Sequence, residues 1–316
     1  MGIEVDGHRS RGIYMVANRN SQSLCDNLIY SIRMAGCVLP IRIIDFGGDK
    51  YKVPCNYSDI KVCDAEQFGK EANLFVNILQ EAMPECNPGF FRRYLAWFGE
   101  FDEFLYTDND IVALIDWTEM FEYLDKYTIV HADHEYDTQG RYNFKKIDTV
   151  EKLYGEKIYD YAITAGHFLC KKSPKHVLDI KSALNWMKDH SEAVKWHDQT
   201  LLQMSCLLGE WKKINLCRHP YNWGSSWHGD YKNVLDVMHT IQQGKRISHI
   251  HYSGYTPRGV EPMEELLVSS ENNKVRSKMV FFNMLKEIIG VNCVINYYKK
   301  ARRVLRSVVS KVRSMW

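Results

Sequence analysis

The chain has 316 residues, with 41 basic and 39 acidic side chains and a formal net charge of +2. Hydrophobic residues make up 45% of the chain and charged residues 25%, which is ordinary for a globular protein with a sizeable core. This balanced charge gives no reason to expect nucleic-acid binding by the chain as a whole.

The cysteines and the N-terminal segment favour a cytoplasmic protein. The nine cysteines include no CxxC pair, so free thiols in a reducing compartment are favoured over a disulfide framework. The opening residues, MGIEVDGHRSRG, carry no apolar stretch, and we expect neither a signal peptide nor a transmembrane anchor.

Apolar runs alternate with helical patterns through the first hundred residues. The runs at 12–20 and 38–49 predict strands, and apolar residues at helical spacing predict helices at 23–34, 65–83 and 90–99. This alternation predicts an α/β fold with a central, mostly parallel sheet flanked by helices. In such sheets, ligands bind beyond the carboxyl ends of the strands.

The pattern continues less regularly in the rest of the chain. Further strands are predicted at 103–114, 127–134 and 161–172, and a helix is predicted at 197–208. A short strand is expected within 246–259.

The stretch EFLYTDNDIVAL, residues 103–114, places Asp108 and Asp110 at the end of a predicted strand. A simple turn is the alternative interpretation, because Asp and Asn favour turns. Two neighbouring carboxylates repel each other, however, and a divalent cation, which prefers oxygen ligands, would relieve that repulsion. The cation could also neutralise a diphosphate, which suits group transfer from a nucleotide donor.

Phosphatases of the haloacid dehalogenase type also end a strand in DxD. They carry Thr two residues after the second Asp, where this chain has Val112. Their motif follows the first strand of the chain, whereas this one follows two predicted strands, so we disfavour that interpretation.

His249 and His251, in the stretch SHIHYSG, are the best further ligand candidates. They stand two residues apart on a predicted strand, and we expect only one of them to serve as a ligand. A satisfied or surface histidine is the alternative for each. A nitrogen ligand beside two carboxylates favours manganese over magnesium. Gly254 follows His251 by three residues and would let the backbone approach a phosphate closely.

Together these motifs resemble the GT-A-fold glycosyltransferases, most closely the retaining family 8 type, which includes glycogenin and lipopolysaccharide galactosyltransferase. FDEFLYTDND, residues 101–110, follows the family's metal motif in register. The family's later motifs have counterparts in Thr164-Ala165-Gly166, in Asp198-Gln199 and in the segment from His251 to Pro257. Two departures are Thr164 in place of Asn and the absence of a Lys before the last motif's end, where Arg258 is the nearest cation.

The resemblance implies a role for each candidate residue. Asp108 would contact the metal and the ribose, and Asp110 and His251 would bind the metal. The further residues implied are Val16, Ala17 and Asn18 for the uracil and ribose, Arg92 or Arg93 for the donor sugar or diphosphate, Asp198 and Gln199 near the anomeric carbon or acceptor, and Asp133 for donor or acceptor hydroxyls. Surface salt bridges are the alternative for the arginines, and a helix N-cap is the alternative for Asp198.

Two other features carry alternatives of their own. The loop at 218–231 contains Tyr221, Trp223, Trp227 and His228, which would either stack an acceptor sugar or pack as a structured loop. After Ile288 the sequence has no acidic residue, and residues 289–316 carry seven basic ones. The apolar residues of this segment fall at the spacing of one helix face, which predicts a basic amphipathic helix. Such a helix would bind an anionic membrane surface, although packing on the domain or on a partner is the alternative. Nucleic-acid binding is disfavoured, because no base-stacking or groove-reading motif accompanies the basic run.

The sequence therefore predicts a GT-A catalytic domain over residues 1–262 and a helical segment over 263–316 that ends in a membrane-associating helix. The predicted function is metal-dependent transfer of a hexose from a UDP-sugar to a glycan or lipid-linked acceptor, in surface polysaccharide synthesis at the inner membrane face. Retention is what the resemblance to family 8 implies. One rival, a nucleotidyltransferase of related fold, is disfavoured because ANRNSQS, residues 17–23, contains no glycine. The other rival is a non-catalytic nucleotide-sugar-binding protein.

Overall fold

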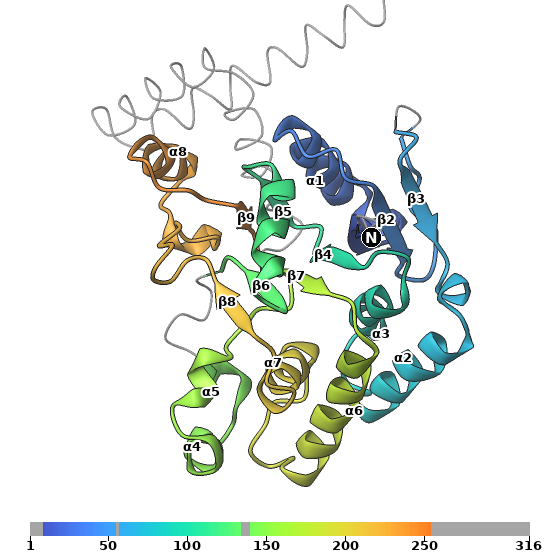
Figure 1. The fold of residues 1–316 in the computed structure, drawn as a ribbon. Coiled ribbons are helices and arrows are strands. Elements are labelled where there is room, and N and C mark those ends of the chain that lie inside the picture. The colour runs from blue at the N-terminus through green and yellow to red at the C-terminus, as the bar shows by residue number, and fades with distance from the viewer. Residues whose placement is uncertain (1–8, 55–56, 134–139, 254–316) are drawn as a thin grey trace, which may run out of the picture.

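The computed structural model of the chain describes residues 9–54, 57–133 and 140–253. A seven-stranded sheet in the order β3-β2-β1-β4-β7-β6-β8 forms its centre (Figure 1). The strands are β1 (Arg11–Ala17), β2 (Ile41–Asp45), β3 (Ile60–Cys63), β4 (Glu103–Thr107), β6 (Ile129–His131), β7 (His167–Lys171) and β8 (Lys213–Asn215). This mixed, mostly parallel sheet confirms the predicted fold class.

The strand β7 is antiparallel to both of its neighbours, β4 and β6, whereas the other strand pairs in this sheet are parallel. In the pairing of β7 with β4, Thr107 lies opposite His167. The start of β7 therefore meets the end of β4, and the backbone N–H of Asp108 donates to the carbonyl of Gly166 at 2.7 Å.

Helices cover both faces of the sheet and enclose two apolar cores. The α-helices are α1 (Gln22–Met34), α2 (Lys70–Ala82), α3 (Pro88–Phe91), α4 (Ile147–Tyr154), α5 (Lys157–Asp160), α6 (Pro174–Asp189), α7 (Asp198–Leu208) and α8 (Val234–Gln242). The 3₁₀ helices are η1 (Arg19–Ser21), η2 (Ala65–Phe68), η3 (Arg92–Phe98), η4 (Trp117–Asp125), η5 (Gly140–Asn143) and η6 (His228–Asp230).

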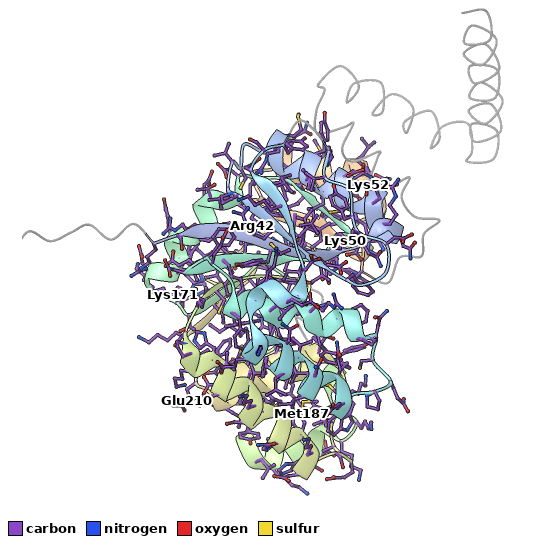
Figure 2. All side chains as sticks on the ribbon, turned by 90° about the vertical axis from the view of Figure 1, so that its right-hand side faces the viewer. Arg42, Lys50, Lys52, Lys171, Met187 and Glu210 are labelled. Atoms are coloured by element: carbon purple, nitrogen blue, oxygen red, sulfur yellow. The ribbon has the colours of Figure 1, made fainter. Side chains whose placement is uncertain are left out.

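Side chains alternate between these two cores along β1. Tyr14 and Val16 pack with residues of α2, η3, α6 and α7, whereas Ile13 and Met15 pack with α1 and η4. Figure 2 shows the helical layer that contains α2 and α6, with Met187 of α6 in the lower half of the picture. Arg42 of β2 lies above this layer in the same view. Because both faces of β1 are covered, its near-continuous apolar sequence is what a central strand requires.

The predicted strand 103–114 is divided between two sheets. The chain leaves the large sheet after Thr107 and enters a separate two-stranded sheet, in which β5 (Ile111–Ala113) pairs antiparallel with β9 (His249–His251). Ile111 lies opposite His251 in this small sheet. The face of this small sheet that carries Val112 and Ile250 packs against α8. The Asp pair thus occupies the crossing between the sheets.

The other predicted elements are present, with shifted boundaries. The helix expected at 65–83 is interrupted at Gly69, which has φ +91 and separates η2 from α2. The helix expected at 90–99 is largely 3₁₀ in form, as η3. The predicted helix at 197–208 matches α7 closely. The segment 254–316, with Gly254, Arg258 and the basic helix, lies outside the described residues, so the predicted boundary at residue 262 stays a prediction.

The seven cysteines in the described ranges are free thiols, as the sequence led us to expect. Among the helices of residues 9–253 that the structure describes, none has the length and apolar character needed to cross a bilayer.

Candidate functional site

A cavity of about 560 Å³ lies where β1 and β4 end. This is the edge of the sheet at which an α/β fold is expected to bind ligands, and the volume is typical of small-molecule sites. Its lining includes Val16, Asn18, Phe46, Phe90, Arg93, Tyr106, Asp108, Asn109, Asp110, Thr164, Ala165, Gly166, Asp198, Gln199, His251 and Ser253.

Asp108, Asp110 and His251 form a candidate metal site in this cavity, with one ligand atom from each within 4.8 Å of the others. The Nε2 atom of His251 is 3.2 Å from Oδ1 of Asp110. The backbone supports this arrangement, because the N–H of Tyr252 donates to the carbonyl of Asp110 at 2.9 Å. Two carboxylates and an imidazole are a ligand set that suits a divalent cation.

The two carboxylates have opposite electrostatic environments. Burial raises the pKa of Asp108, and the Asp110 charge adds to that effect against the opposing charge of Arg93. Burial also acts to raise the pKa of Asp110, but the neighbouring His251 outweighs it, so the net change in pKa is downward. A divalent cation would favour the ionised form of both groups.

His249 lies on the same face of β9 as His251, because residues two apart in a strand point the same way, but it is outside the cavity lining. Its ring stacks on that of His167, with centroids 3.9 Å apart, and Trp117 packs edge-on against His167 at 4.7 Å. Both ring nitrogens of His167 are buried without a hydrogen-bond partner. Burial lowers the pKa of His167 to about 3, with a smaller contribution from His251, so this ring is neutral at pH 7.

Gly166 gives the site its close packing. A Cβ atom at this position would lie 2.4 Å from Cε1 of His251 and 3.1 Å from Oδ2 of Asp108. Only glycine therefore leaves room for the imidazole and the carboxylate to stand beside β7.

Arg93 joins the metal site to the start of α7. Its guanidinium lies 3.4 Å from Oδ1 of Asp108 and 3.2 Å from Oδ2 of Asp198, and it also donates to the carbonyl of Ala165. Burial acts to lower the pKa of Arg93, but the two carboxylates raise it overall, so the side chain is a permanent cation. The Tyr106 hydroxyl donates to the same Oδ1 atom of Asp108 at 2.8 Å.

Three predicted residues lie outside the cavity lining. Arg92 turns toward the Asp45 carbonyl, because neighbouring helical residues point in different directions. Ala17 faces the core beneath α1, since it alternates with Val16 along β1. Asp133 is 3% exposed and bonds to His131 and Thr164 instead of opening into the cavity.

The loop after β1 is held by side-chain amides. Asn18 accepts from the N–H of Asn20 and donates to the carbonyl of Gly47, both at 3.0 Å. Asn109, which the sequence interpretation did not single out, donates to the Val16 carbonyl at 3.2 Å. Its position between Asp108 and Asp110 was the feature of the sequence that could have predicted a place in the cavity lining.

Asp198 and Gln199 line the cavity at the start of α7. The predicted alternative of an N-cap at Asp198 is wrong, because His197 is the N-cap and its ring accepts from the N–H of Thr200 at 3.2 Å. The Asp198 side chain is therefore available to bind Arg93. Gln199 donates to Oδ1 of Asn143 at 3.1 Å.

Aromatic side chains missed by the sequence interpretation form one wall of the cavity. Phe90 is 46% exposed and meets Phe46 at 6.5 Å between ring centroids. In the predicted aromatic loop, by contrast, Tyr221 and Trp223 pack against Tyr123, at 5.0 and 6.3 Å between centroids. The packed-loop alternative therefore describes these two rings.

Solved structures share this fold at low sequence identity. LgtC, solved as an active-site mutant, matches with a TM-score of 0.52 and 15% identity over 82% of this chain and 95% of its own. Mouse xyloside xylosyltransferase 1 matches with a TM-score of 0.50 and 13% identity, over 78% of this chain and 99% of its own. The bifunctional glycosyltransferase WbbM gives a TM-score of 0.51 at 13% identity; the match covers 86% of this chain but only 51% of WbbM.

These matches show that the chain has the GT-A fold, as the resemblance to family 8 predicted. A family model described as "Mannosyltransferase putative" matches residues 10–200. The chain belongs to this mannosyltransferase family. No curated protein matches the chain in sequence.

We expect Gly166→Ala to weaken metal binding at least 10-fold, because the added methyl group would displace His251 from Asp108. Calorimetric titration with manganese measures this effect. Gly155→Ala is a useful control, since a Cβ there meets nothing within 4 Å, although its φ of +62 makes a stability check necessary. Unchanged manganese affinity in Gly166→Ala would show that His251 is not a ligand.

We also expect His167 to make the protein acid-labile. Its folded-state pKa of about 3 lies below the unfolded value of 6.5, so only the unfolded chain gains this proton as the pH falls between those values. The free energy of unfolding should therefore drop by about 1.4 kcal/mol per pH unit well below 6.5 from this group alone. Urea unfolding at several pH values should give a shallower acid slope for His167→Phe but not for His239→Gln, whose ring is exposed. Equal slopes would contradict the assignment.

Proposed function

We propose that this protein transfers a hexose from a nucleotide-diphosphate sugar to a glycan or lipid-linked acceptor, with a divalent metal at Asp108, Asp110 and His251. The observation that carries the proposal is one cavity that holds both this metal-ligand set and the Arg93–Asp198 pair. The family description favours mannose as the hexose. The resemblance to family 8 favours a UDP-sugar, and manganese is the favoured metal because one ligand is a nitrogen.

The residues divide the cavity into two parts. Val16, Asn18 and Asn109 lie at the end of β1, where they would hold the base and ribose, and the metal would support the diphosphate as a leaving group. Asp198 and Gln199 lie beyond Arg93, where they would face the anomeric carbon and the acceptor.

In this proposal, Arg93 fixes the positions of the side chains that would hold the donor. The guanidinium orients the carboxylates of Asp108 and Asp198 at the same time, so the donor's diphosphate and sugar would be held in one geometry. Retention would follow if the acceptor hydroxyl attacked from the face that the diphosphate leaves, with a phosphate oxygen accepting the proton. The side chains that line the cavity need supply no covalent nucleophile for that reaction.

Donor turnover tests the proposal directly. Nucleoside diphosphate release should be measured with UDP-glucose, UDP-galactose, UDP-xylose and GDP-mannose, with manganese, with magnesium and with a chelator. We expect one donor to be cleaved only with metal. Asp110→Asn should lower that rate about 100-fold or more, since a lost metal ligand removes several kcal/mol of charge stabilisation.

Asp189→Asn is the matched control, because Asp189 is an exposed residue at the end of α6. Turnover that survives both the chelator and Asp110→Asn would rule out a catalytic metal here. Metal-dependent nucleotide binding without cleavage, even with added acceptors, would favour the non-catalytic binding protein, and pyrophosphate release would favour the nucleotidyltransferase.

We further propose that the protein is cytoplasmic and peripheral on the inner membrane face, in surface polysaccharide synthesis. The support is the basic, amphipathic sequence of residues 289–316. Each basic residue near an anionic surface contributes roughly 1 kcal/mol of attraction. A lipid-linked acceptor would give such attachment a purpose.

Replacing Lys299, Lys300, Arg302 and Arg303 together with Gln should abolish sedimentation with vesicles that contain anionic lipid. Donor hydrolysis in solution should be unchanged, because none of these four residues is a candidate site residue. Replacing the lysines and arginines with each other keeps the charge and serves as the control. Undiminished vesicle binding by the Gln variant would eliminate an electrostatic anchor in this segment.

A further inference from the structure

A buried polar chain runs from β8 to Thr164 in the cavity lining. Lys213 donates from Nζ to Nε2 of His131 at 2.9 Å and to the Ala162 carbonyl at 2.9 Å. Nδ1 of His131 lies 2.5 Å from Oδ2 of Asp133. The hydroxyl of Thr164 is 3.1 Å from the same oxygen.

Hydrogen-bond chemistry fixes the direction of every step in this chain. The Lys213 ammonium can only donate, so Nε2 of His131 accepts and the ring proton sits on Nδ1. Nδ1–H then donates to Asp133, whose carboxylate is acceptor-only. The Thr164 hydroxyl must therefore donate to Asp133.

Electrostatics favour the same protonation states. Burial acts to raise the pKa of Asp133, but His131 and the charge of Lys213 lower it to about 2. Burial and the nearby Lys213 lower the pKa of His131 to about 4, although Asp133 opposes them. Burial lowers the pKa of Lys213 to about 8, although Asp133 opposes it. Near pH 7 the main form is therefore a lysine cation and an aspartate anion joined through a neutral imidazole.

The segment that carries Thr164 is held on three sides. Asp133 accepts the Thr164 hydroxyl, Arg93 donates to the carbonyl of Ala165, and the backbone N–H of Asp108 donates to the carbonyl of Gly166. Thr164 is 2% exposed and cannot turn its hydroxyl proton to the cavity without breaking its bond to Asp133.

We propose that Thr164 presents only an oxygen lone pair to the cavity and accepts a hydrogen bond from one hydroxyl of the donor sugar, with Asp133, His131 and Lys213 as positioning residues. This inference rests on the proposed function. An asparagine at this place, as in the family that the sequence resembles, could donate as well as accept. Thr164 would instead require a hydroxyl group that donates, and it would disfavour a donor whose hydroxyl is missing or replaced by fluorine.

The experiment scans the sugar one hydroxyl at a time. GDP-mannose and UDP-galactose, with their 2-, 3-, 4- and 6-deoxyfluoro analogues, are titrated into wild type, Thr164→Val and Thr164→Ser by calorimetry with manganese. Fluorine cannot donate, so in wild type it should weaken binding at the contacted position by about 10-fold. In Thr164→Val that one penalty should disappear while penalties at other positions persist, and Thr164→Ser should restore it.

Asp133 supplies the test of positioning. Asp133→Asn keeps an oxygen that can accept from Thr164 and should retain the fluorine penalty. Asp133→Ala frees the hydroxyl to donate to fluorine and should reduce the penalty to about 2-fold or less. Affinity for the nucleoside diphosphate alone should be unchanged in each variant, which also checks that the variants are folded.

The outcomes separate this inference from the proposed function. If wild type binds a nucleotide sugar but Thr164→Val keeps every fluorine penalty, Thr164 makes no such contact and the inference falls while the proposed function stands. Equal penalties in Asp133→Ala and Asp133→Asn would remove the positioning role. If wild type binds neither nucleotide sugar nor nucleoside diphosphate, the proposed function and this inference both fail.

Discussion

Ion pairs of Arg93 tie the end of β4 to the start of α7, and the geometry of the cavity depends on them. The guanidinium reaches Asp108 and Asp198, which are 90 residues apart in sequence, and both contacts are within 3.4 Å. A buried cation is costly unless its partners are close and well oriented. Here the partners are carboxylates that would otherwise repel a diphosphate, so one side chain satisfies two requirements.

The antiparallel strand β7 provides the other half of the site. Because β7 runs against β4, its first residues lie beside the last residues of β4, and Gly166 meets Asp108 directly. A parallel strand in that place would bring its carboxyl end there instead, with its connection leading away. The small sheet then adds His251 from a segment more than 140 residues beyond Asp108, so the candidate metal site needs three separate parts of the chain.

The sequence predicted the features that local patterns control. Buried strands such as β1 and β4 are visible as apolar runs, and Asp108, Asp110 and His251 carry a recognisable chemistry at the ends of such runs. Long-range contacts were not predictable in the same way. Asp133 looked like a cavity residue because it ends a strand, but its partner His131 is held in turn by Lys213 from another strand. The choice between Arg92 and Arg93 depended on the rotation of a 3₁₀ helix, which a helical pattern alone does not fix.

The two-stranded sheet of β5 and β9 has a thermodynamic consequence. An isolated pair of strands is only marginally stable, and this pair relies on packing against α8 on one face and against the core beneath α1 on the other. Asp110 immediately precedes β5 and His251 ends β9, so a cation bound to both would cross-link the ribbon at that end. By mass action, metal present at a hundred times its dissociation constant would add about 2.7 kcal/mol to the ribbon's stability. The two-stranded sheet would then be most stable when metal is present, which is also when a diphosphate can bind.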